Sequence, residues 1–154
     1  MVDRIRLPGR RAVLLPAGRQ SSGRHLSAVS VPERHHHLTT TSVTFAATYP
    51  VSASALFEAA SAYNMRIITG KTWMDRNAPP QLLDTPESAY ADSRELIRRW
   101  HGRGRNLYAI TPRFAITSTF EELRLAGRLH AEYPSTYVHT HLSETRAEVQ
   151  CHVA

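Results

Sequence analysis

Cysteine is almost absent from this sequence, and long apolar runs are missing altogether. The single cysteine, Cys151, cannot form an internal disulfide, which fits a reducing compartment and predicts a cytoplasmic protein. No run of eighteen apolar residues occurs, so no segment is predicted to span a membrane. The first residues, Met1–Arg11, contain no apolar stretch long enough for a signal peptide. With 154 residues, 42% of them hydrophobic, the chain is expected to be globular.

The excess positive charge is concentrated in the first quarter of the chain. Residues 1–40 hold seven arginines against Asp3 and Glu33, whereas the remainder is nearly balanced, for a net charge of +6. A basic segment can bind nucleic acid or other polyanions. These arginines show no helical spacing, and no aromatic residue lies among them to stack on a base. We therefore expect no specific nucleic-acid partner, and a non-enzymatic basic polyanion-binding relic is kept as an alternative.

The chain divides into two parts of different composition. Residues 1–38 are rich in Arg, Pro, Ser and His and show neither helical nor strand periodicity, so they bury too little apolar surface to fold. We expect a disordered segment, and its composition also suits a frameshifted reading of a GC-rich gene. Residues 39–154 contain alternating β-branched and amphipathic stretches, which predict a folded domain.

Strand and helix patterns alternate four times in the second part. Thr85 and Pro86 predict the start of one helix, and Ser118 with Glu121 predicts a capping box at another. This α/β alternation indicates parallel strands with crossover helices. About four consecutive βα units are too few for a closed eight-stranded barrel, so they predict a small open sheet or a partial (β/α)8 barrel of the TIM type. The predicted strands are residues 40–48, 65–71, 106–111 and 136–140, and the predicted helices are residues 52–63, 86–102, a segment after 118 and one opening near 144.

The end of the fourth predicted strand carries two histidines and a glutamate. In an extended strand His139 and His141 share one face, and Glu144 follows just beyond the strand. In parallel α/β folds, functional residues gather at the carboxyl ends of strands. Neutral imidazole is a common zinc ligand, and a nearby carboxylate can move protons. The competing interpretation is one packed histidine and one solvated histidine.

Two earlier loops carry further candidates. Arg113 and Phe114 follow the third strand, and this pair can bond a planar acceptor and stack on a heterocycle. The competing interpretation is a surface arginine beside a core phenylalanine. Asp75, Arg76 and Asn77 lie in a long loop after the second strand, where they either line a site or brace the loop by hydrogen bonds.

Four blocks of residues match a known pattern in order and spacing. Together they resemble the guanine deaminases of the amidohydrolase superfamily, whereas any one block alone is only suggestive. The resemblance covers residues 39–150. The blocks are GK-x-x-MDRNAP (Gly70–Pro79), LLDTPESAY (Leu82–Tyr90), YAITPRFAITST (Tyr108–Thr119) and THLSE (Thr140–Glu144).

The resemblance implies a (β/α)8 barrel that binds zinc, hydrolyses guanine to xanthine and ammonia, and forms a homodimer. It implies that His141 is a zinc ligand and that Glu144 is the catalytic residue that relays a proton to the leaving ammonia. Arg113 and Phe114 match the pair that binds and stacks the purine. The full substrate-binding set that it implies is Arg113, Phe114, His141, Leu142, Ser143 and Glu144.

The chain also departs from the family pattern. The family has a His-x-His pair on its first strand, and a further histidine and a metal-binding aspartate well after the fifth strand, which have no match here. His35, His36 and His37 lie too close to the next predicted strand to be the first pair. Because one histidine cannot hold catalytic zinc, we expect the chain alone to be inactive.

Two other classes of hydrolase are alternatives to a guanine deaminase. Zinc base deaminases that use a Pro-Cys-x-x-Cys motif are excluded, because the chain has one cysteine. An amidohydrolase acting on another aminopurine or on a triazine is the alternative within the superfamily. Arg113 and Phe114 favour guanine, since both family binding residues are kept.

Overall fold

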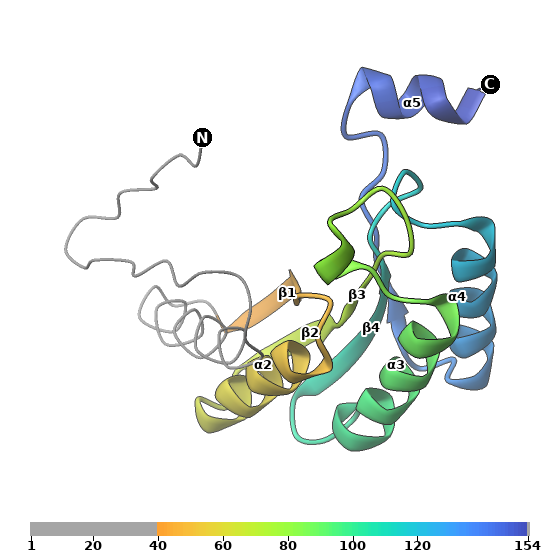
Figure 1. Ribbon diagram of the computed structural model, residues 1–154. Coiled ribbons are helices and arrows are strands. Elements are labelled where there is room, and N and C mark those ends of the chain that lie inside the picture. Colours follow the sequence, from red (N-terminus) through yellow and green to blue (C-terminus); the bar gives the residue numbers. More distant parts are fainter. Residues whose placement is uncertain (1–39, 154) are drawn as a thin grey trace.

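The computed structural model describes residues 40–153, which form a parallel sheet covered by helices (Figure 1). The predicted disordered segment 1–38 and the histidines at 35–37 lie outside the described residues. No helix in the described part of the chain is long and apolar enough to cross a membrane.

Every strand pairing in the sheet is parallel, and the strands follow one another across the sheet in chain order. β2 and β3 are successive segments at one position in the sheet, between β1 and β4. Ile67 of β2 lies opposite Asn106, and Thr72 of β3 lies opposite Thr111, so the register is unchanged across Lys71. The strands are β1 (Thr41–Phe45), β2 (Arg66–Gly70), β3 (Thr72–Trp73), β4 (Asn106–Pro112) and β5 (Tyr137–Val138).

The helices that connect these strands lie on one face of the sheet (Figure 1). Along that face α2 contacts α3, and α3 contacts α4. Sequential parallel strands with all crossover helices on one side are the arrangement of part of a (β/α)8 barrel, so this prediction is confirmed. The helices are α2 (Pro50–Ala62), α3 (Pro86–Trp100), α4 (Phe120–Glu132) and α5 (Arg146–Val153), and a short 3-10 helix, η1 (Pro80–Leu82), precedes α3.

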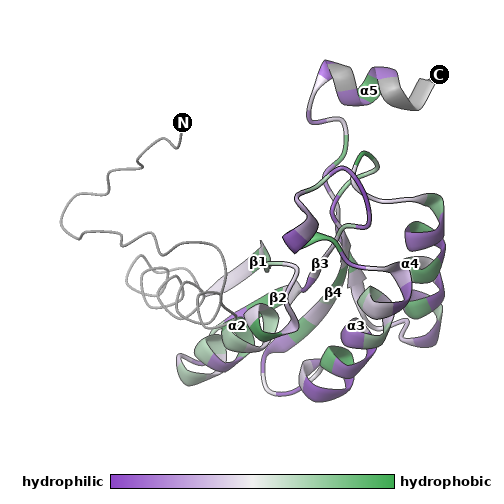
Figure 2. Cartoon of the chain, viewed as in Figure 1, coloured by the Kyte–Doolittle hydropathy of each residue, from purple (hydrophilic) through white to green (hydrophobic). Residues whose placement is uncertain are grey.

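The hydrophobic core lies between the sheet and the three connecting helices. α3 and α4 each show an apolar stripe and a polar stripe, as expected for helices that cover a sheet (Figure 2). Two polar groups inside this core share one partner: the Trp73 indole N–H and the Tyr108 hydroxyl both donate to Ser93 Oγ, at 2.8 and 2.9 Å. The largest apolar side chains in the core, all less than 2% exposed, include Phe57, Trp73, Tyr108, Ile110 and Leu129.

Two local predictions need correction. The N-cap of α4 is Thr119, whose hydroxyl accepts from the Glu122 N–H at 3.3 Å, so the predicted capping box of Ser118 and Glu121 is wrong by one residue. Ser118 is instead a buried residue of the loop before the helix. Tyr63, the last residue of the predicted helix 52–63, is the C-cap and is 43% exposed, because the helix ends at Ala62.

β2 ends at Gly70, and Lys71, the only lysine of the sequence, lies between β2 and β3. A Cβ on Gly70 would lie 1.8 Å from the Ala109 carbonyl oxygen, so no larger residue fits at this crossing. The Lys71 side chain is completely buried and forms ion pairs with Asp84 and, at 3.5 Å, with Asp92. A buried ammonium group between two carboxylates therefore joins the sheet to the loop before α3 and to α3 itself.

Candidate active site at the carboxyl ends of the strands

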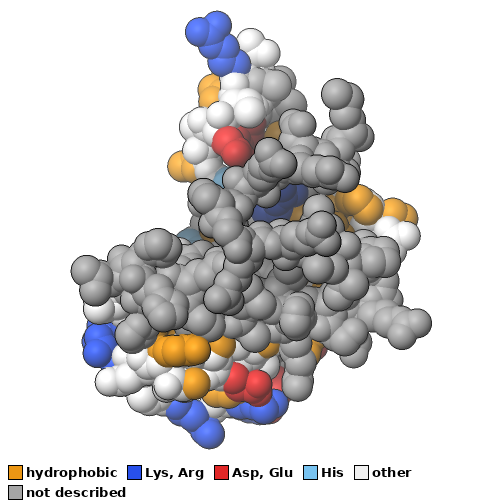
Figure 3. Space-filling model, turned by 90° about the vertical axis from the view of Figure 1, so that its left-hand side faces the viewer, with side chains coloured by type: hydrophobic (Ala, Val, Ile, Leu, Met, Phe, Trp, Pro, Cys, Tyr) orange, Lys and Arg blue, Asp and Glu red, His pale blue; other side chains and the backbone are white. Residues whose placement is uncertain are grey.

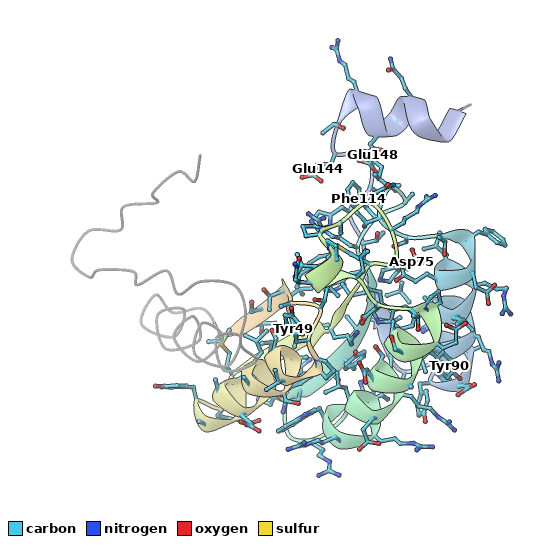
Figure 4. The ribbon with its side chains drawn as sticks, viewed as in Figure 1. Tyr49, Asp75, Tyr90, Phe114, Glu144 and Glu148 are labelled. Carbon is cyan, nitrogen blue, oxygen red and sulfur yellow. The ribbon has the colours of Figure 1, made fainter. Side chains whose placement is uncertain are left out.

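The candidate residues lie at one edge of the sheet, because parallel strands place their carboxyl ends together. Asp75 follows β3, Arg113 follows β4, and His141 follows β5. Phe114 and Glu144 lie at this same end of the molecule in Figure 4, with Glu148 at the start of α5 nearby. The structure thus brings Arg113, Phe114 and His141 together at two neighbouring strand ends.

Arg113, Phe114 and His141 form the centre of this arrangement. The His141 N–H donates to the Arg113 carbonyl oxygen at 2.8 Å, which continues the β4–β5 pairing past the strands. The Arg113 guanidinium lies over the Phe114 ring, 5.1 Å from its centroid. The Phe114 and His141 rings meet edge to face, with centroids 6.2 Å apart. A second contact, 3.6 Å from Nη1 to the Met74 sulfur, also restrains the guanidinium.

The His141 imidazole has a defined orientation. Its Nδ1 lies 3.1 Å from the Arg113 carbonyl oxygen, and a carbonyl can only accept, so Nδ1 carries the proton. The Nε2 lone pair is then available. A backbone carbonyl that fixes the tautomer in this way is the usual support of a metal-ligating histidine.

Phe45, at the end of β1, is the residue that sequence reasoning missed. Its ring stacks on His139 at a centroid distance of 4.3 Å and also lies 4.5 Å from the His141 ring. β1 and β5 are not neighbours in the sheet, so this contact forms across the face opposite the helices. Burial lowers the pKa of His139 to about 4, with a smaller contribution from His141, so His139 is neutral. In the sequence Phe45 lies inside the predicted strand 40–48, so no signal marked it as part of the site.

The loop after β5 carries the proposed proton-transfer residue, Glu144, which is exposed. Leu142 is 77% exposed, and Ser143 adopts a left-handed conformation with φ of 55°. The backbone N–H groups of Ser143 and Glu144 donate to the Glu148 carboxylate at 3.0 and 2.7 Å. The position of Glu144 is therefore set by a contact between this loop and α5.

The loop after β3 braces the loop that follows β4. Asp75 accepts from both the N–H, at 2.8 Å, and the hydroxyl of Thr119. Arg76 donates to the Ala115 carbonyl oxygen, and Asn77 donates to the Ile116 carbonyl oxygen at 2.7 Å. Of the two interpretations of this loop, bracing is the one that the structure supports. The loop after β3 therefore restrains the loop that carries Phe114.

Glu122, on α4 beneath this loop, is completely buried. Burial raises the pKa of its carboxyl group to about 7 from the ordinary 4.5. The Ser118 hydroxyl and Lys71 lower this pKa, whereas the charges of Asp75 and Asp84 raise it further. The carboxyl group is therefore held near its midpoint of titration at neutral pH.

Glu122→Gln is expected to stabilise the protein at alkaline pH. A folded-state pKa above the unfolded one means that the contribution of Glu122 is fully present below pH 4.5 and is lost as pH rises through 7. The variant cannot ionise, so at pH 8 it should be more stable by up to about 3 kcal/mol, and at pH 4 no more stable than the parent. Urea unfolding between pH 4 and 8 measures this difference. Glu121→Gln, at an exposed neighbour paired with Arg124, is the control and should not stabilise the protein at pH 8.

His141 is the one metal ligand that the sequence predicts. Within residues 40–153, no three His, Cys, Asp or Glu side chains come together as a metal-binding group. His141 has the tautomer of a ligand, yet a zinc centre needs at least three protein ligands. The described residues therefore do not complete a zinc site.

Comparison with known proteins agrees with this fold. Residues 35–154 match the amidohydrolase family, so the chain belongs to that family. It is 56% identical to guanine deaminase from Escherichia coli over 126 residues, which are 82% of this chain and 29% of that protein. The structure of the Escherichia coli enzyme matches with a TM-score of 0.81 over 84% of this chain and 30% of that one, at 54% identity.

Other solved structures show the same fold. Guanine deaminase from Bradyrhizobium japonicum matches with a TM-score of 0.77 at 44% identity, over 84% of this chain and 29% of that one. Atrazine chlorohydrolase from Arthrobacter aurescens, in complex with zinc, matches with a TM-score of 0.71 over 79% of this chain and 30% of that one. At 18% identity this last likeness supports the fold alone. The chain spans about three tenths of the length of these relatives.

Proposed function

We propose that this chain forms the purine-facing part of a guanine deaminase, which hydrolyses guanine to xanthine and ammonia. The observation that carries the proposal is the convergence of Arg113, Phe114 and His141 at adjacent strand ends. The 56% identity to a guanine deaminase supports guanine as the substrate.

Each side chain has a distinct role in the proposed reaction. The Arg113 guanidinium donates hydrogen bonds to the planar oxygen and nitrogen acceptors of the purine. Phe114 stacks against the heterocycle and helps to exclude water from it. Glu144 relays a proton to the departing ammonia, while the backbone around Leu142 and Ser143 lines the substrate. The exposed carboxylate of Glu144 and the exposed guanidinium of Arg113 are both accessible to such a ligand.

The proposed cofactor is zinc, with the Nε2 of His141 as one ligand. A bound zinc would make water nucleophilic at neutral pH. The other ligands are not found among residues 40–153. The cytoplasmic location and the homodimeric state remain predictions.

The alternatives from the sequence have less support. A triazine substrate is suggested by relatives at 16–18% identity, whose likeness supports the fold alone. The polyanion-binding alternative rests on the arginines between Arg4 and Arg34, which lie outside the described residues, whereas residues 41–154 are nearly balanced in charge. Where described side chains are visible in Figure 3, basic and acidic groups both occur.

The proposal is tested with a chimera, in which residues 40–150 replace the matching segment of the Escherichia coli guanine deaminase. We expect the chimera to bind zinc and to release ammonia from guanine with a much higher kcat/KM than from adenine or a triazine. The isolated chain, assayed in parallel, is expected to release none, because residues 40–153 contain no complete ligand set. A folded, zinc-loaded chimera that prefers adenine or a triazine, or hydrolyses none of them, would contradict the proposal.

A further inference from the structure

The turn before α5 needs a specific support. Ser143 has φ of 55°, a left-handed conformation that side chains other than glycine and asparagine adopt at a cost of about 1 kcal/mol or more. Glu144 follows directly, so the conformation of this turn sets the direction in which the Glu144 side chain leaves the backbone. A residue that holds the turn therefore also determines where the Glu144 carboxylate can reach.

Glu148 provides that support from the first turn of α5. Its Oε1 accepts from the Ser143 N–H at 3.0 Å, and its Oε2 accepts from the Glu144 N–H at 2.7 Å. The side chain is only 2% exposed, so water does not compete effectively for these charge-assisted bonds. The start of the helix is capped as well, since the Glu148 backbone N–H donates to Thr145 Oγ1 at 3.2 Å.

The contact differs from ordinary helix capping. In a capping box the glutamate at the third helical position bonds the backbone N–H of the N-cap residue, here Thr145. Glu148 instead reaches further back and binds the two residues before Thr145. It thus ties the turn that carries Glu144 to α5, in addition to satisfying the start of the helix.

We propose that Glu148 is a positioning residue, whose buried carboxylate binds the Ser143 and Glu144 N–H groups and so directs the Glu144 carboxylate towards the substrate. This inference rests on the proposed function, in which Glu144 transfers the proton. Glu148 itself touches no substrate. Its loss should therefore lower kcat and leave KM for guanine nearly unchanged, because Arg113 and Phe114 are held by other contacts.

The contact is tested first in the full chain, by nuclear magnetic resonance measurement of amide exchange at Ser143 and Glu144. Glu148→Ala removes both acceptors and is expected to speed exchange of both amides by roughly tenfold or more. Glu148→Gln preserves the shape and one acceptor oxygen, so its effect should be smaller. Unchanged exchange in both variants would overturn the proposal.

The catalytic consequence is tested in the chimera defined above. We expect Glu148→Gln to lower kcat by about tenfold, and Thr145→Ala, which weakens the start of α5 but keeps the carboxylate, to have a much smaller effect. Equal losses in the two variants would assign the effect to helix stability and overturn the positioning role. An active chimera whose kcat is unaffected by Glu148→Ala overturns the role alone, whereas an inactive parent chimera overturns the proposed function and this inference with it.

Discussion

Glu144→Gln in the chimera is expected to lower kcat for guanine hydrolysis by about a thousandfold, within the range that positioned acid–base groups contribute. Glutamine retains the size of the side chain and can still form hydrogen bonds. It cannot accept and release a proton, which the departing ammonia requires. KM should change little, because Arg113 and Phe114 provide the contacts with the purine ring. Steady-state ammonia release at saturating guanine measures the effect.

The control for this prediction is Glu121→Gln, which removes a carboxylate on the exposed face of α4. It should leave kcat unchanged. Retention of more than a tenth of the parent kcat by Glu144→Gln, in protein with an unchanged zinc content, would argue against proton transfer by Glu144. A raised KM with an unchanged kcat would instead indicate a binding role.

Lys71→Met is expected to destabilise the chain by about 3 kcal/mol, the lower end of the range for breaking a buried ion pair. The substitution removes the only cation from a position where Asp84 and Asp92 both approach the ammonium group. The two side chains are 19% and 39% exposed, so water relieves part of the resulting repulsion. Burial already raises the pKa of Asp84, against the lowering effect of Lys71, so losing the lysine should raise this pKa further.

Urea unfolding at pH 7 measures the loss in Lys71→Met. Lys71→Met/Asp84→Leu should recover part of the stability, because an apolar pair can replace a buried ion pair. Arg124→Met, which breaks an exposed pair with Glu121, is the matched control and should cost less than about 1 kcal/mol. A cost for Lys71→Met no larger than that of the control would show that the buried pair contributes little to stability.

The elements of the domain were predictable from local patterns. Helical spacing in α2 and α3, the Thr85 cap with Pro86, and the β-branched runs are properties of contiguous residues, and they recur in the structure at nearly the predicted bounds. The last strand is the weakest match, since only Tyr137 and Val138 are paired. Backbone hydrogen bonds to β4 continue beyond these two residues, from His139 to Ile110 and from His141 to Arg113.

The candidate site was predictable only in part. The motifs pointed to Arg113, Phe114, His141 and Glu144, and chain order explained why their strand ends are neighbours. Nothing in the spacing of the sequence indicated that Phe45 stacks on His139, because β1 and β5 are not adjacent in the sheet. The direction of each side chain across the open face had to come from the three-dimensional arrangement.

The sequence by itself determined the family, the alternation of strand and helix, and the residue types available for purine binding and proton transfer. These follow from short-range periodicity and from motifs, both of which are local in the chain. Only the tertiary structure decided which groups restrain one another: Asp75 with Thr119, Lys71 with Asp84, and Glu148 with the backbone before α5. Such pairs depend on the paths of the loops and on the exclusion of water from particular atoms. Both depend on packing between segments that are far apart in the sequence, or on the conformation of the turn that joins the two partners.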